Sequence, residues 1–194
     1  MEQFRPATTD HVQAPAQEAS DVVPEFGPRD FRNALGRFAT GITVVTMRAP
    51  AEDASGAVTH EEQTFGITVN AFMSVSLDPP LIAVSVDKRA RAHGTMLTAE
   101  RFGISVLAAG QERLSDVFAG RPVEPPAEPF EQYADFPVVR GALTQLVLST
   151  YQAHDAGDHT IFVGKVEALR YSEGQPLLFF KGQYEQLPAA QPVG

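Results

Sequence analysis

The chain has 194 residues, of which 43% are hydrophobic, and this size and composition suit one globular domain with a sizeable core. Its formal net charge of −9 argues against nucleic acid and anionic membrane surfaces as partners, because both attract a basic surface. The absence of Cys excludes disulfides, thiolate metal sites and a Cys nucleophile.

The N-terminal segment, residues 1–28, holds many Pro, Ala, Gln and Glu residues without an apolar period. We expect a flexible arm, which is either a plain tail or a segment that wraps a partner subunit. A helix should follow, with Asp30 as its N-cap. Phe31, Leu35 and Phe38 would then share one face, and this face is expected to be core rather than a cofactor contact.

Strands are expected to dominate the rest of the chain. Residues 42–48 and 64–75 are rich in β-branched side chains and flank a polar turn region, which predicts a hairpin. Residues 121–136 hold four Pro and should form an extended surface loop. Further strands are expected at residues 81–86, 102–107, 143–153, 160–170 and 177–180, and further helices at residues 93–99 and 111–119.

This order of elements places strands next to strands more often than it alternates them with helices. It predicts a mainly β fold, an antiparallel β-barrel with peripheral helices, rather than a doubly wound sheet. We expect one domain over residues 29–187, followed by a short tail over residues 188–194. No apolar run is long enough to span a membrane, and the N-terminus shows no signal pattern, so a cytoplasmic location is expected.

The most informative segment is the strand-like run at residues 68–76. Small hydroxyl and amide residues at a strand edge leave space for a flat ligand and offer hydrogen bonds to it. The alternative is an ordinary β-bulge with turn-forming polar residues. The candidate cofactor-binding residues of this run are Thr68, Val69, Asn70, Ala71, Ser74, Val75 and Ser76.

A basic loop follows the next expected strand. Asp87 precedes Lys88, Arg89 and Arg91, in a chain with only 15 basic residues. Such a cluster can bind the phosphate or diphosphate of a ligand. The alternative is a solvated turn.

Residues 154–159 carry two His and two Asp. Ala-Gly between the acids indicates a tight hairpin turn, and neighbours at such short spacing seldom converge on one ion, so we expect no metal site. The segment is then either a polar hairpin tip or a place where Asp158 and His159 help to bind a ligand.

These segments resemble the short-chain flavin reductase family, the reductase partners of two-component flavin-dependent monooxygenases. Residues 68–80 match every element of the family pattern T-x-N-[AS]-F-x-S-[VL]-S-x-[DN]-P-P. Residues 157–159 are its Gly-Asp-His signature, and residues 176–184 match P-L-L-[YF]-[FHW]-[RK]-G-x-[YF]. Arg91 and Ala92 stand where the family commonly carries hydroxyl residues, so Arg91 is a candidate substitute for them.

The resemblance implies an FMN-binding split barrel that assembles as a homodimer. It places His159 at the flavin face where the nicotinamide stacks, and this residue is the candidate catalytic residue. Lys181 and Tyr184 could close the site from the last strand, or could simply belong to an exposed terminal strand.

The function implied is an NAD(P)H:flavin oxidoreductase that passes a hydride to FMN or FAD and supplies reduced flavin to a partner monooxygenase, if only by diffusion. NADH is expected as the donor, with NADPH possible, because the basic residues are already assigned to the flavin. The alternatives are a flavin carrier or sensor, a split-barrel oxidase that acts on a small molecule at bound FMN, and a barrel that binds proteins.

Overall fold

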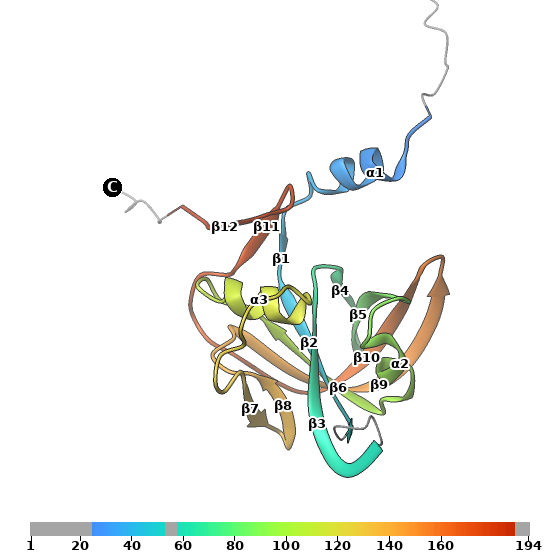
Figure 1. Ribbon diagram of the computed structural model, residues 1–194, viewed down its shortest axis with the longest axis vertical. Helices are drawn as coiled ribbons and strands as arrows, with labels where there is room; N and C mark the ends of the chain where they lie inside the picture. The colour runs from blue at the N-terminus through green and yellow to red at the C-terminus, as the bar shows by residue number, and fades with distance from the viewer. Residues whose placement is uncertain (1–24, 53–57, 189–194) are drawn as a thin grey trace, which may run out of the picture.

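The computed structural model describes residues 25–52 and 58–188 (Figure 1). Most of the expected N-terminal arm and C-terminal tail lies outside these residues, so the division of the chain into arm, domain and tail stays a prediction.

The described residues form three helices and twelve strands. The helices are α1 (Pro28–Leu35), α2 (His93–Thr98) and α3 (Glu112–Phe118). The strands are β1 (Thr40–Gly41), β2 (Thr43–Glu52), β3 (Val58–Val69), β4 (Phe72–Leu77), β5 (Pro80–Asp87), β6 (Arg101–Val106), β7 (Phe130–Tyr133), β8 (Phe136–Val139), β9 (Thr144–Ala156), β10 (His159–Tyr171), β11 (Leu178–Phe180) and β12 (Gln183–Glu185).

Seven strands form one antiparallel sheet in the order β3-β2-β6-β9-β10-β5-β4. Its two outer strands, β3 and β4, are joined by Asn70 and Ala71 alone, so the sheet must curl until its edges meet at that end. The prediction of a mainly β antiparallel barrel with peripheral helices is confirmed. The expected hairpin is β2–β3, although its second strand ends at Val69 and the chain restarts as β4.

The interior of the barrel is filled by large apolar side chains from facing strands. Phe102, Phe162, Met47 and Leu148 are fully buried there. Gly164 lies directly against the ring of Phe102, where a Cβ atom would collide with it. The barrel wall is therefore a closely packed support for whatever lies at its ends.

The prediction of a surface loop at residues 121–136 is only partly correct, because residues 130–136 belong to the hairpin β7–β8. The turn of this hairpin is Ala134 and Asp135, which both adopt left-handed backbone with φ of 48° and 57°. Without Gly or Asn at the first position, the sequence gives no signal for a two-residue turn of this kind.

Two arginines hold the β7–β8 turn in place. Arg48 Nη2 donates to Asp135 O at 2.7 Å, and Arg101 Nη2 donates to Ala134 O at 3.4 Å. Both guanidinium groups also lie over the ring of Phe136, at 5.3 and 5.4 Å from its centroid. These contacts offset the cost of the left-handed turn.

Helix α1 forms where the sequence predicted a helix, but Asp30 is not its N-cap. The N-cap is Gly27, Pro28 occupies the first turn, and the Asp30 carboxylate accepts the backbone N–H of Gly27 at 3.1 Å. Asp30 therefore acts from the first turn, where a carboxylate also interacts well with the helix dipole.

The sequence predicted that the apolar face of α1 is part of the core, but in this chain it is not. Phe31, Leu35 and Phe38 are 52%, 58% and 78% exposed. Figure 1 shows α1 standing apart from the barrel, beyond the small ribbon formed by β1, β11 and β12. The hydrophobic pattern is real, but within one chain it has no barrel surface to pack on.

We expect Ala134→Gly to raise the free energy of unfolding by up to about 1 kcal/mol. Left-handed backbone costs an L-residue roughly 1–2 kcal/mol, and Gly removes this cost. Gly also has more freedom in the unfolded chain, which lowers the stability of the folded state by roughly 0.4–1 kcal/mol and offsets part of the gain. Chemical denaturation checks this. Ala99→Gly is the control, because Ala99 has φ −70° and should only lose stability. Equal losses at both positions would contradict the strain argument.

Candidate active site

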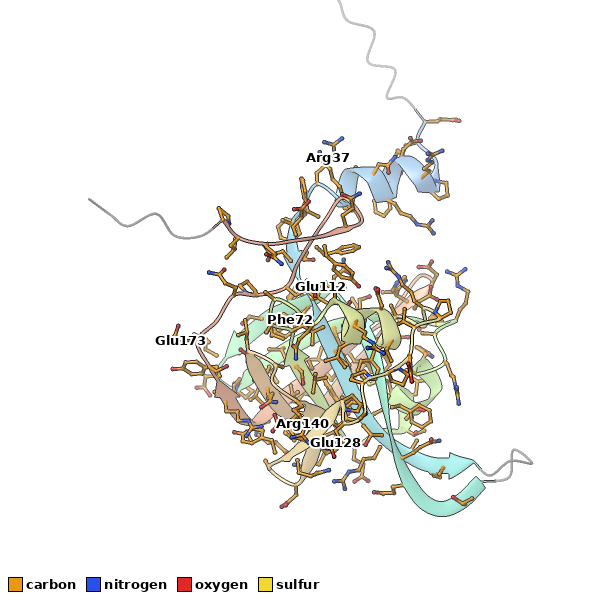
Figure 2. The ribbon with its side chains drawn as sticks, turned by 60° about the vertical axis from the view of Figure 1, so that its left-hand side comes forward. Arg37, Phe72, Glu112, Glu128, Arg140 and Glu173 are labelled. Carbon is orange, nitrogen blue, oxygen red and sulfur yellow. The ribbon has the colours of Figure 1, made fainter. Side chains whose placement is uncertain are left out.

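A groove of about 1340 Å³ lies between α1 and the near end of the barrel. It is lined by α1 and the segment after it, the β3–β4 connection, β5, the start of β10 and the β11–β12 turn. In Figure 2, Phe72 lies at the end of the barrel toward α1, whereas Glu128 and Arg140 lie at the opposite end. Ligand pockets commonly measure roughly 300–1000 Å³, so this groove has room for two ring systems side by side.

The structure brings about half of the predicted site residues to this groove. Those that line it are Asn70, Ala71, Asp87, Arg89, Asp158, His159 and Lys181. Those outside its lining are Thr68, Val69, Ser74, Val75, Ser76, Lys88, Arg91 and Tyr184.

The two residues between β3 and β4 form a tight turn at the groove. Phe72 N donates to Asn70 O at 3.0 Å, and Ser85 N donates to Ala71 O at 3.1 Å. The side chain of Asn70 makes no hydrogen bond with another described residue, although it is exposed in the groove. An amide with free donors and an acceptor is thus held on a fixed backbone beside small neighbours.

The strand residues before this turn have structural contacts. Thr68 Oγ1 donates to Ser115 O at 2.8 Å, which ties β3 to α3, and Val69 O accepts the hydroxyl of Thr43 at 2.8 Å.

The residues after the turn lie on β4, the edge strand of the sheet. The register passes from Ser74, opposite Ile82, to Ser76, opposite Leu81. Val75 is therefore the extra residue of a β-bulge, which is the simpler of the two interpretations of this run.

Asp87 and Arg89 form a preorganised pair on the groove wall. Asp87 Oδ1 accepts from Arg89 N at 2.8 Å and from Nε at 3.1 Å, and Oδ2 accepts from Nη2 at 2.7 Å. These hydrogen bonds hold the pKa of Asp87 well below its usual range and raise the pKa of Arg89. Since only two of the five guanidinium N–H groups are used, Arg89 can still bind an anion.

The other two cations of the basic loop point elsewhere. Lys88 Nζ lies 2.9 Å from the carboxylate of Asp155, and the guanidinium of Arg91 lies 5.6 Å from the ring centroid of Phe65. Each has a partner on the barrel wall, so only Arg89 of the three cations lines the groove.

The turn between β9 and β10 is the tight hairpin tip expected from the sequence. Gly157 has φ +64°, and Lys88 N donates to Asp158 O at 2.9 Å, which ties the turn to the basic loop. The pairing of β10 with β5 sets His159 opposite Asp87. His159 Nδ1 lies 2.7 Å from Asp158 Oδ1, and this hydrogen bond lowers the pKa of Asp158.

The β11–β12 turn carries Lys181 and Gly182, with φ of 50° and 81°. Lys181 N donates to Gly36 O at 2.9 Å, which joins this turn to the end of α1. Tyr184 instead donates its hydroxyl to Asp116 of α3, which also pairs with Arg121 at 2.8 Å, and burial raises the pKa of Tyr184. Lys181 is thus a groove residue, whereas Tyr184 anchors the ribbon to α3.

Sequence reasoning missed four polar residues of the groove. Arg32, Thr40, Thr43 and Ser85 all line it. Thr40 Oγ1 is buried without a hydrogen-bond partner among the described residues. None of them lies in a segment that the sequence assigned to ligand binding, so only the tertiary structure could identify them.

Neither a metal cluster nor a membrane helix is found in the described part of the chain. No group of three or more His, Cys, Asp or Glu residues there could hold a metal ion. No helix there is long and apolar enough to cross a membrane.

Comparisons with known proteins agree on one family. The model of the flavin reductase like domain matches residues 35–188. The chain is 43% identical over 171 residues to an NADH-dependent flavin reductase from Rhodococcus sp, covering 88% of this chain and 93% of the relative. It is 40% identical over 158 residues to the reductase component of 4-hydroxyphenylacetate 3-monooxygenase from Thermus thermophilus, covering 81% and 95%.

A solved structure is also similar. The flavin reductase PheA2 in its native state superimposes with a TM-score of 0.73 at 39% identity, covering 84% of this chain and 99% of that chain.

We expect Tyr184→Phe to lower the free energy of unfolding by about 1–3 kcal/mol, because it removes a hydrogen bond to a carboxylate. Flavin affinity should not change, since Tyr184 lies outside the groove lining. Denaturation and flavin titration of the same variant check both points. Tyr151→Phe is the control, as Tyr151 is exposed and its hydroxyl has no described partner. A loss of flavin binding without a loss of stability would show that Tyr184 is a flavin-binding residue, as the sequence predicted.

Proposed function

The chain belongs to the flavin reductase like family, and we propose from this that it is an NADH-dependent flavin reductase that supplies reduced flavin to a monooxygenase. The observation that carries the proposal is that the turns of three separate segments meet at one groove. These are Asn70-Ala71, Asp158-His159 and Lys181-Gly182. Redox exchange between two planar cofactors needs such a shared, open space.

The barrel side of the groove fits a flavin ring system. Ala71, Ala83 and Ser85 are small and leave room for a planar group close to the backbone. Asn70 supplies free donors and an acceptor for the polar edge of the ring, and the buried Thr40 hydroxyl has no hydrogen-bond partner in the described part of the chain. When bound, the flavin supplies the redox chemistry by accepting a hydride, and FMN and FAD both carry the ring that does this.

The charges of the groove suit a phosphate. Arg32, Arg89 and Lys181 line it, against the carboxylates of Asp87 and Asp158. Each carboxylate already accepts a hydrogen bond from a neighbouring side chain. We therefore assign Arg89 to the flavin phosphate. Lys88 and Arg91 are assigned to holding the loop that carries Arg89, through their contacts with Asp155 and Phe65.

His159 is the residue we assign to the nicotinamide. It stands at the start of β10, on the same wall as Arg89 and within the same groove as Asn70. Hydride transfer requires no protein acid or base, so the task of this side chain is to orient the dihydronicotinamide against the flavin. NADH is available in the cytoplasm, where we place the reaction.

A second copy of the chain is proposed to complete the groove. Helix α1 has eight residues and buries none of them, and an isolated helix of that length is marginal in water. Phe31 and Leu35 of this helix, and Phe38 in the segment after it, are exposed toward or beside the groove. Packing this face against a partner barrel in a symmetric dimer would bury it and narrow the opening.

The purified chain should oxidise NADH only when FMN or FAD is present. Steady-state NADH oxidation, followed at each flavin in parallel with riboflavin, checks this and ranks the flavins. If no flavin binds at tens of micromolar, as judged by fluorescence quenching, the proposed function is wrong.

Arg89→Gln should weaken FMN binding more than riboflavin binding. One charge-assisted contact is worth roughly 1.5–3 kcal/mol, which corresponds to about ten- to a hundredfold in the dissociation constant. Arg91→Gln is the matched control, because it removes the same charge outside the groove lining. Equal losses for both flavins in Arg89→Gln would exclude a phosphate contact.

The protein should be a dimer of about 42 kDa, twice the 21.0 kDa of one chain. Leu35→Asp should shift it toward monomer and lower activity, because a charge on the apolar face of α1 would be buried without a partner. Light scattering at micromolar concentration measures the mass. A fully active monomer would contradict the assembly.

A further inference from the structure

The hydrogen-bonding character of His159 in the groove is set by which ring nitrogen carries the proton. In a neutral imidazole one nitrogen donates and the other accepts, and the contact of one nitrogen selects the role of the other. Nδ1 lies 2.7 Å from Asp158 Oδ1. An ionised carboxylate can only accept, so Nδ1 carries the hydrogen and Nε2 is left with its lone pair.

We propose that Asp158 is a positioning residue that fixes His159 as the Nδ1–H tautomer, so that Nε2 accepts a hydrogen bond from the ligand. Nε2 has no hydrogen-bond partner among the described residues. The matching ligand group is a neutral donor such as the carboxamide NH₂ of a nicotinamide. The choice of ligand rests on the proposed function, whereas the tautomer does not.

The turn holds the Asp158 carboxylate where this contact is made. Asp158 O accepts the backbone N–H of Lys88 at 2.9 Å, and Lys88 Nζ pairs with Asp155 at 2.9 Å. The side chain is 78% exposed and that of His159 is 40% exposed, so burial does not force the pair together. The contact instead follows from sequence adjacency, because Asp158 ends the tethered two-residue turn and His159 is the first residue of β10.

A second carboxylate, that of Asp87, belongs to the residue paired with His159 in the β5–β10 register. Both of its oxygens are engaged by Arg89, at 3.1 Å from Nε and 2.7 Å from Nη2. Asp87 is thus held by Arg89, and Asp158 is the carboxylate within hydrogen-bond distance of the imidazole.

The test is the tautomer of His159 in the full-length protein. Long-range proton–nitrogen spectra of the ¹⁵N-histidine-labelled chain distinguish Nδ1–H from Nε2–H at a pH where the imidazole is neutral, and His159→Gln identifies the signal. We expect Nδ1–H in the wild type and a shift toward Nε2–H in Asp158→Ala. Nε2–H in the wild type, or an unchanged tautomer in Asp158→Ala, would overturn the proposal.

Kinetics test whether the tautomer matters. Asp158→Ala should raise the KM for NADH by roughly 2- to 10-fold, the range of one neutral hydrogen bond, with the KM for flavin unchanged. In a His159→Gln background, whose amide does not depend on Asp158, the same change should have no effect. An equal effect in both backgrounds would show that Asp158 acts without His159.

Asp155→Asn is the control for the turn, because it removes a charge from the same hairpin outside the groove lining. It should leave both the tautomer and the KM unchanged; if it reproduces the effects of Asp158→Ala, the turn and not the carboxylate is responsible. A wild type that oxidises no NADH would remove the proposed function, while the spectrum would still decide the tautomer.

Discussion

The candidate site depends on the antiparallel pairing of β5 with β10. This pairing runs from Leu81 opposite Lys165 to Asp87 opposite His159. It brings the end of one strand and the start of the other to the same point on the barrel, so the basic loop and the Gly-Asp-His turn become neighbours. A shift of one residue would turn every side chain of β10 to the other face, and the buried Phe162 prevents such a shift.

Around that point polar side chains are held in defined pairs. Asp87 is bound by Arg89, Asp158 by His159, and Lys88 by Asp155, so each charged group near the turn has a defined partner. Exposed pairs of this kind add little to stability. Their value lies in orientation, because a polar side chain that is already held loses less conformational freedom when a ligand arrives.

The sequence predicted the barrel well because strand alternation, turn residues and the buried run of β5 all agree. It predicted the site less completely. The family patterns identify segments, but Thr68 lies on β3 and bonds to Ser115 of α3, whereas Asn70 lies in the turn after β3. Ser74 and Ser76 lie on either side of the β4 bulge, outside the groove lining. Lys88 and Arg91 were indistinguishable from Arg89 by residue type, and only the positions of Asp155 and Phe65 separate them. The β7–β8 turn was missed because arginines far away in sequence stabilise it.

The backbone hydrogen bond from Lys181 N to Gly36 O joins the β11–β12 turn to the end of α1, outside the barrel core. Ligand contacts in this wall are therefore separate from the packing that stabilises the barrel. The wall of the groove that contains α1 lies outside the barrel, and no residue of α1 is buried in the barrel core. Substitutions in that wall can therefore accumulate at small cost to the folding of the barrel, while those on its apolar face would act on the proposed dimer. A lineage could retune which ligand it accepts, or how quickly it releases one, while the β-barrel beneath keeps its sequence.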